Sequence, residues 1–300
     1  MITAFTLLLA CLALGVGVAR YARPPIGLAQ ALNWWVIQIA LPALVLSTVP
    51  SLKFDPALWF LVLTQWGVFF GAWALIAFIG GRAGWSRATI GGLILVTGLG
   101  NTSFMGYPLL EALRGREGLQ LGVVADQLGC FIMLAVGGVL VASRYGGAQV
   151  TPAGMVKRVL LFPAFIALVV GVIVGQLGGW PETLATILER FSITLVPLAL
   201  FSVGLRFKLK PQRGQWGPVA IALSWKLLLA PLLALGLALL TGVGGPVMSI
   251  GVLQTAMAPM ISAAILADQH QLDPPLANTV LGVGILLSLI TVPLWSLVLP

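Results

Sequence analysis

Long apolar stretches alternate with short polar gaps along the whole chain. A helix needs about 20 mainly apolar residues to cross a bilayer, and ten stretches meet that requirement. Their expected bounds are 2–19, 31–50, 57–80, 88–111, 118–143, 158–178, 183–205, 216–241, 246–268 and 275–299. The pattern therefore predicts an all-α polytopic membrane protein with ten transmembrane helices.

The residue composition favours the same class of protein. Hydrophobic residues make up 59% of the chain and charged residues 8%, which leaves too little polar surface to cover a soluble globule. The formal net charge is +8, but the 16 lysines and arginines are scattered through the gaps instead of gathering on one basic face. We therefore expect a lipid bilayer around the chain and no nucleic-acid partner.

Lysines and arginines collect in alternate gaps. Eleven of them follow the odd-numbered stretches: Arg20, Arg23, Arg82, Arg87, Arg144, Lys157, Arg158, Arg206, Lys208, Lys210 and Arg213. Four lie toward the opposite ends of the stretches: Lys53, Arg114 and Arg116 follow even-numbered stretches, and Arg190 lies just inside the seventh stretch. Because membrane proteins keep positively charged loops in the cytoplasm, this bias predicts that both termini lie outside it.

Two segments of the chain resemble each other. Residues 42–47 read PALVLS and residues 197–202 read PLALFS, an offset of 155 residues. Five apolar stretches separate the copies, so the copies should have opposite orientations in the membrane. The chain is therefore predicted to consist of two inverted five-helix repeats, 1–146 and 152–300. A chance match between two apolar, proline-containing helices is the alternative.

Glycine, proline and small polar residues interrupt the stretch 88–111. Residues 99–108 read LGNTSFMGYP, a composition that a regular helix tolerates poorly. The offset of 155 residues carries Asn101 into the segment QTAMAPMIS at 254–262, which predicts a second break. Backbone groups freed by a break must find partners in hydrocarbon, and paired interruptions mark the binding sites of transporters.

The candidate substrate-binding residues lie in these two segments. Half-helix ends present free N–H groups and the positive end of the helix dipole there. The candidates are Asn101, Thr102, Ser103, Tyr107, Pro108, Gln254, Pro259, Met260, Ile261 and Ser262. The alternative is that each segment forms an ordinary proline kink in a continuous helix.

Ionisable residues inside apolar stretches are functional candidates, because placing one at a helix centre costs about 2.5–3.5 kcal/mol. Asp126, beside Gln127, and Lys226 are candidates for proton coupling. A structural hydrogen bond is the alternative for Asp126, and extension of the long stem to the membrane surface is the alternative for Lys226. Cys11 and Cys130 lack metal-ligand spacing and are interpreted as packing residues.

Several motifs resemble the auxin efflux carrier family. They are Leu32-Asn33 with Leu41-Pro42, Gly100-Asn101-Thr102-Ser103-Phe104-Met105-Gly106-Tyr107-Pro108-Leu109-Leu110, and Ala258-Pro259 followed by Ala267-Asp268-Gln269 and Leu272-Asp273-Pro274. The resemblance extends over nearly the whole chain. It implies ten helices in a fold similar to that of bile-acid symporters, with broken helices 4 and 9 that cross, and elevator-type transport of carboxylates.

Plant members of that family carry a long hydrophilic loop between the halves. This sequence has only a short linker there, so it is more similar to the bacterial malonate, malate and lactate permeases. The similarity implies a multi-pass protein of the bacterial inner (plasma) membrane. The sequence departs from the family near the second break, where Met260, Ile261 and Ser262 stand in place of an expected amide.

The predicted function is secondary transport of a small organic anion. A Walker-type phosphate-binding loop is absent from the sequence, so ion gradients are expected to supply the energy, and neither an enzyme activity nor a cofactor or bound metal is expected. Proton or sodium coupling and a homodimer stay open. The alternatives are a passive anion channel and a sodium-coupled symporter, in which sodium would bind side-chain oxygens of Asn101, Asp126, Gln127 and Gln254.

Overall fold

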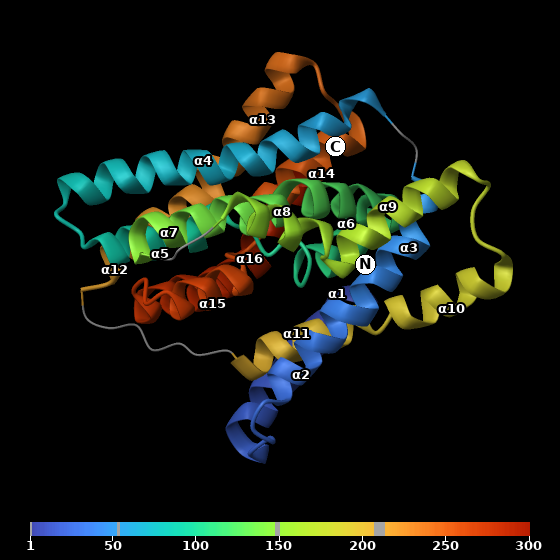
Figure 1. Ribbon diagram of the computed structural model, residues 1–300, viewed down its shortest axis with the longest axis horizontal. Helices are drawn as coiled ribbons and strands as arrows, with labels where there is room; N and C mark the ends of the chain where they lie inside the picture. The colour runs from blue at the N-terminus through green and yellow to red at the C-terminus, as the bar shows by residue number, and fades with distance from the viewer. Residues whose placement is uncertain (1, 53–54, 148–150, 207–213) are drawn as a thin grey trace. The chain divides into compact units, whose positions relative to one another are not determined.

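The computed structural model describes residues 2–52, 55–147, 151–206 and 214–300 (Figure 1). Within these residues every regular element is a helix, and the one extended pairing is an isolated antiparallel bridge between Gly100 and Pro259. The all-α prediction is therefore confirmed. Four cations of the predicted charge bias lie outside the described residues: Lys53, Lys208, Lys210 and Arg213.

Six helical stretches of the described chain are long and apolar enough to cross a membrane. They are Leu28–Ser51, Pro56–Arg82, Gly106–Gly146, Glu182–Leu205, Trp216–Thr241 and Pro274–Val298. Three further apolar helices are shorter: Leu9–Ala22, Arg87–Gly98 and Pro163–Gln176. The helices fit a polytopic membrane protein, and the count of ten spans stays a prediction.

The chain folds into two compact units. Unit 1 comprises Met1–Asp55, Ser103–Val123 and Arg158–Phe207, and unit 2 comprises Pro56–Thr102, Val124–Lys157 and Lys208–Pro300. Each unit takes segments from both predicted halves of the chain. The compact units are thus different from the repeats expected at 1–146 and 152–300, whose assignment as repeats stays a prediction.

Unit 1 is built from helices that pack against one another. Its helical segments are α1 (Ile2–Gly17), η1 (Val18–Ala22), α2 (Leu28–Trp35), η2 (Val36–Ala40), α3 (Leu41–Thr48), η3 (Val49–Ser51), α6 (Gly106–Val124), α9 (Pro163–Gln176), α10 (Glu182–Ser192) and α11 (Leu195–Arg206), where η marks a 3₁₀ or π turn. α1 packs along α11, and a Cβ on Gly15 would lie 2.9 Å from the Cα of Gly204. Glycine permits this close approach of the two backbones.

Unit 1 contains two helix interruptions that the sequence did not predict. The expected stretch 158–178 is divided, because Phe162 is extended (φ −72°, ψ 124°) and α9 begins at Pro163. A residue before proline is pushed out of the helical conformation. The expected stretch 183–205 is divided between α10 and α11, with Pro197 in the first turn of α11, where its missing N–H is tolerated. In both places a proline lies at the start of a new helix.

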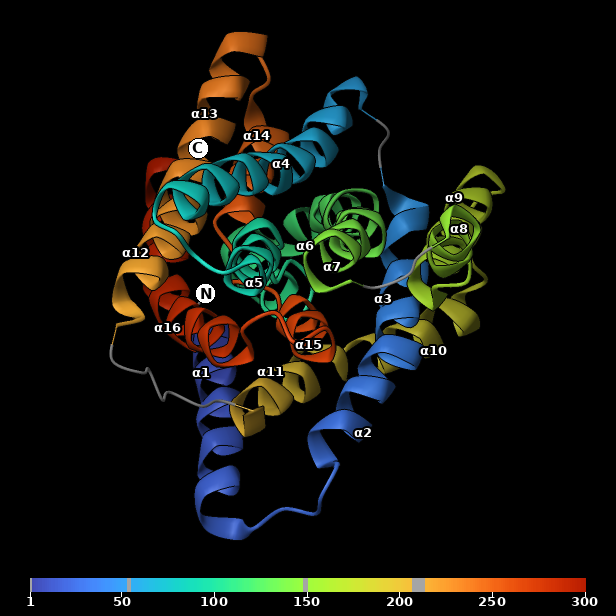
Figure 2. The ribbon, with the colours of Figure 1, turned by 60° about the vertical axis from the view of Figure 1, so that its left-hand side comes forward.

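Unit 2 surrounds one short buried helix. Its helical segments are η4 (Pro56–Leu58), α4 (Trp59–Arg82), α5 (Arg87–Gly98), η5 (Ala125–Cys130), η6 (Met133–Gly138), α7 (Val139–Gly146), α12 (Trp216–Ser224), η7 (Trp225–Leu229), α13 (Ala230–Thr241), α14 (Gly245–Thr255), α15 (Ile261–Gln269) and α16 (Pro274–Val298), and α8 (Pro152–Leu160) crosses the unit boundary. Within unit 2, α5 packs against α4, α7, α12, α15 and α16 (Figure 2).

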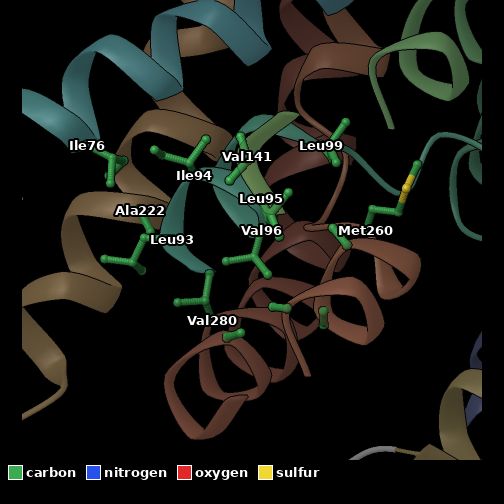
Figure 3. Packing of buried hydrophobic residues seen from close by; sticks show 14 of the residues in the cluster. Ile76, Leu93, Ile94, Leu95, Val96, Leu99, Val141, Ala222, Met260 and Val280 are labelled. Carbon is green, nitrogen blue, oxygen red and sulfur yellow. The ribbon is translucent and has the colours of Figure 1, made fainter. Parts of the chain in front are cut away.

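The central position of α5 follows from its sequence. Every residue from Ile90 to Gly98 is buried, as expected of a helix that is apolar on all sides. Figure 3 shows the apolar side chains of α5 among those of α4, α7, α12 and α16: Ile76, Val141, Ala222 and Val280. This core fixes the C-terminal end of α5, where the first predicted break begins.

Candidate functional site

The helices are interrupted at both predicted breaks. α5 ends at Gly98 and the next helix of the chain begins at Gly106, while α14 ends at Thr255 and α15 begins at Ile261. Leu99 is extended (φ −107°, ψ 123°). We call residues 99–102 together with residues 256–260 the paired breaks; all of them lie in unit 2.

Backbone hydrogen bonds join the two breaks. The N–H of Asn101 donates to the carbonyl of Ala258 (2.7 Å), and the N–H of Met260 donates to the carbonyl of Leu99 (2.9 Å). Polar backbone groups that leave a helix at membrane depth need such partners. Each break therefore satisfies part of the other, and this mutual pairing explains how irregular backbone is stable in a buried position.

Asn101 lies in the first break and is buried, with 1% of its surface exposed. Its backbone N–H is occupied, but its side-chain amide nitrogen has no hydrogen-bond partner among the described residues. Buried polar groups are nearly always paired. An unpaired amide donor at a helix break is therefore a candidate contact for a ligand.

Thr102 connects the first break to two neighbouring helices. Its hydroxyl donates to a carboxylate oxygen of Asp126, and its carbonyl accepts from the side-chain nitrogen of Gln254 (3.3 Å). Gln127 donates to the other oxygen of Asp126 (2.7 Å). Asp126 thus accepts hydrogen bonds at both oxygens, as an ionised carboxylate does.

Asp126 and Gln127 lie in a π-helical turn, η5. Such turns widen an α-helix, leave backbone groups without regular partners and recur at functional sites. The carbonyl of Leu128 in η5 accepts a hydrogen bond from the indole of Trp66 (3.3 Å). The Oε1 oxygen of Gln127 has no hydrogen-bond partner in the described part of the chain.

Lys226 lies in a second π-helical turn, η7, and none of its surface is exposed. The expected alternative, in which its stem reaches the membrane surface, is therefore wrong. Its Nζ lies 2.8 Å from the position that a Cβ on Gly100 would occupy. Over the residues that the structure describes, this nitrogen has no hydrogen-bond partner. The ammonium group is thus buried beside the first break.

Cys130 contacts the same glycine. Cys130 is a free cysteine in the hydrophobic core, as expected of a packing residue, and its thiol also donates to the carbonyl of Gly100 (3.2 Å). Asp126 and Cys130 are four residues apart in one helical segment, and that spacing places two side chains on one face. This spacing was a signal in the sequence that could have linked them.

Two further polar residues near this region were missed by the sequence reasoning. Gln65 of α4 lies against Gly129, and Thr97 belongs to the last turn of α5. Both are buried, and neither the amide nitrogen of Gln65 nor the hydroxyl of Thr97 has a hydrogen-bond partner among the described residues. Their position inside apolar stretches was the available signal.

The predicted site residues fall in both compact units. Unit 2 contains Asn101, Thr102, Asp126, Gln127, Lys226, Gln254, Pro259, Met260, Ile261 and Ser262. Unit 1 contains Ser103, Tyr107 and Pro108. Tyr107 and Pro108 are buried, and Ser103 is partly exposed. The paired breaks thus bring together the candidates of unit 2, and the contribution of the other three stays a prediction.

A family model described as "Membrane transport protein" matches residues 27–296. The chain belongs to this family. It is the auxin efflux carrier family that the motifs resembled. An uncharacterised transporter of Methanothermobacter thermautotrophicus is 31% identical over 280 residues, covering 90% of this chain and 89% of the relative. An uncharacterised transporter of Methanocaldococcus jannaschii is 28% identical over 216 residues, covering 70% and 68%. The chain is thus similar to membrane transporters of the auxin efflux carrier family.

Proposed function

We propose that the protein is a secondary carrier for small organic anions that bind at the paired breaks. The observation that carries this proposal is a pair of buried nitrogen donors, the side-chain amide of Asn101 and the ammonium of Lys226, neither of which has a hydrogen-bond partner among the described residues. Both groups only donate hydrogen bonds at these atoms. A carboxylate only accepts, so it is the complementary ligand.

The backbone near the second break favours the same charge. α15 begins at Ile261, directly after the break, and its first turn has N–H groups that no intrahelical carbonyl accepts. The N-terminal end of a helix carries a partial positive charge. One ammonium and one amide suit a monocarboxylate, and the similarity to bacterial permeases supports lactate, malate and malonate as test substrates in the bacterial inner membrane.

An elevator mechanism is part of the proposal, with unit 2 carrying the anion relative to unit 1. The repeat offset of 155 residues moves the segment Met1–Asp55 almost onto the segment Arg158–Phe207, and both belong to unit 1. Matching parts of the predicted inverted repeats would then form the fixed unit. Under this assignment both termini lie outside the cytoplasm.

Asp126 is the proposed site of proton coupling. It is buried in unit 2 and hydrogen-bonded to Thr102, whose backbone belongs to the first break. A change in the protonation of Asp126 would change that hydrogen bond, since a protonated carboxyl group becomes a donor. Through this hydrogen bond, proton binding at Asp126 would directly change the geometry of the paired breaks.

The test is uptake into liposomes that contain the purified protein. Radiolabelled acetate, lactate, malonate and malate are offered under separately imposed proton, sodium and voltage gradients. The proposal predicts saturable uptake of at least one carboxylate and faster uptake when the same unlabelled anion is inside, because exchange is a property of carriers. Linear uptake without such exchange would indicate a channel, and absence of uptake for every anion would contradict the proposal.

A further inference from the structure

Lys226 is an exception among the charged residues of the described chain. Its surface is completely buried, and its Nζ has no hydrogen-bond partner among those residues. A buried charge is normally paired, because the desolvation of an ion costs several kcal/mol that only a well-placed partner offsets. A lysine retained in this position therefore needs a partner that binds there.

Gly100 lies next to the ammonium of Lys226. The Nζ of Lys226 lies 2.8 Å from the position that a Cβ on Gly100 would occupy, and the thiol of Cys130 donates to the carbonyl of the same glycine. Asp126 itself accepts hydrogen bonds from Thr102 and Gln127. The amino group of Lys226, which is covalently part of the protein, is thus placed beside the first of the paired breaks.

The π-helical turn η7 positions this charge. Its carbonyl at Leu227 accepts from the indole of Trp295 (2.9 Å), which anchors the turn to α16. Trp225, the residue before Lys226, packs against Gly71 of α4. The backbone of Lys226 is therefore held from two sides, and the reach of its side chain is set by the fold.

We propose that Lys226 is a tethered counter-ion that takes the place of a sodium ion beside the transported anion. The inference rests on the proposed function: the ammonium of Lys226 pairs with the transported anion, so binding needs no sodium ion. Without such a lysine, the anion would be buried as an unpaired charge unless a mobile cation accompanied it, and an unpaired charge within the membrane is costly. Here the cation is supplied by the chain, and transport is predicted to be independent of sodium.

The decisive experiment is chemical rescue of Lys226→Ala. Wild type and variant are reconstituted in liposomes, and uptake of whichever of acetate, lactate, malonate and malate the wild type transports fastest is measured in N-methylglucamine, sodium or methylammonium salts. Wild-type uptake should be the same in all three. Uptake by Lys226→Ala should fall at least about tenfold in N-methylglucamine, the effect of ~1.4 kcal/mol, and recover severalfold when methylammonium or sodium fills the vacated position.

Lys157→Ala is the matched control, because Lys157 is exposed and lies outside the site. It should behave as the wild type in every salt. The inference is overturned if the wild type requires sodium, if Lys226→Ala transports at the wild-type rate in N-methylglucamine, or if the folded variant is inactive and no small cation restores it.

Thermal unfolding of the purified proteins gives a readout that a structural lysine would not produce. Lys226→Met removes an unpartnered charge and should raise the apparent Tm of the anion-free protein by about 2–4 °C. Saturating anion should raise the Tm of the wild type by more than that of Lys226→Met. A lower Tm for Lys226→Met together with an undiminished shift by the anion would contradict the inference.

Failure of the two proposals can be told apart. If the wild type takes up none of the four carboxylates, the proposed function is wrong and the inference falls with it. If the wild type takes up an anion only in sodium, the proposed function stands and the tethered counter-ion is wrong. The wild-type measurement alone decides this point, so the result does not depend on whether a Lys226 variant folds.

Discussion

The two compact units use their buried polar side chains in opposite ways. In unit 1 buried and partly buried polar side chains pair with each other: the buried hydroxyl of Ser202 donates to the partly buried Asn33 (2.6 Å), and the partly buried indole of Trp35 donates to Thr194 (3.1 Å). Across the described residues of this unit, no buried side-chain nitrogen or oxygen lacks a hydrogen-bond partner. Its polar groups act as structural contacts between helices.

Unit 2 leaves several of its polar atoms unpaired. Buried side-chain atoms without a hydrogen-bond partner among the described residues include those of Gln65, Thr97, Asn101, Gln127 and Lys226. Each unsatisfied group costs about 1–3 kcal/mol. A ligand that pairs with these groups would offset such a cost, so the contrast between the units supports the proposed binding site in unit 2.

Asn101→Ala should give the largest difference between the two units. The variant loses a donor that the folded protein does not use, so we expect uptake to fall about 100-fold, equivalent to ~2.8 kcal/mol, while the free energy of unfolding stays the same. Initial rates in liposomes and thermal unfolding measure the two quantities. Asn33→Ala is the matched control in unit 1, where loss of the bond from Ser202 should lower stability by about 1 kcal/mol and leave the affinity for the anion unchanged.

Replacing one glycine of each unit by alanine should have the next largest effect, and the effect should differ between the units. Gly100→Ala meets the flexible end of Lys226, 2.8 Å from the new Cβ, so the variant should fold while uptake drops about tenfold, the effect of ~1.4 kcal/mol. Gly15→Ala meets the backbone of α11, which cannot move aside, and should lower stability by about 1–3 kcal/mol. Equal loss of stability in both variants would show that the side chain of Lys226 cannot move aside at Gly100.

Asp126→Asn should change coupling without abolishing binding. The amide keeps the size of the carboxylate, and Gln127 can present its oxygen to the new amino group by rotating its own amide. We expect stimulation of uptake by an imposed proton gradient to disappear, while exchange of labelled for unlabelled anion continues. Unchanged stimulation would leave Asp126 with a structural role through Thr102.

The two cysteines provide the mildest test. Cys130→Val removes the hydrogen bond to the Gly100 carbonyl and should lower the free energy of unfolding by about 0.5–1.5 kcal/mol. Cys11 is buried in α1 of unit 1, and Cys11→Val should change stability by less than about 0.5 kcal/mol. Denaturant or thermal unfolding of both variants in detergent gives the comparison, and equal effects would show that the Cys130 bond adds no stability.

The sequence predicted the helical class and both breaks, because apolar length and the clustering of glycine and proline are local properties. The breaks at Phe162 and Thr194 were missed although Pro163 and Pro197 are present, since a proline in an apolar stretch is equally compatible with a kink and with a new helix. The π-helical turns η5 and η7 have no sequence signature that the analysis of periodicity detects.

The chemistry of the site was predicted less completely than its position. Asn101 and Asp126 stood out because polar residues inside apolar stretches are rare. Their partners are set by tertiary packing: Thr102 donates to Asp126 from the first break, and Cys130 donates to Gly100, 30 positions away in sequence. The proximity of Lys226 to Gly100 depends on the packing of η7 near α5, which no local pattern encodes.

Calorimetric titration of the purified protein with its transported carboxylate tests the central claim most directly. The account predicts one saturable site in the wild type, binding at least about tenfold weaker in Asn101→Ala, a loss of ~1.4 kcal/mol, and wild-type affinity in Asn33→Ala. Wild-type affinity in Asn101→Ala, or equal weakening in the two variants, would contradict the assignment of the binding site to the paired breaks of unit 2.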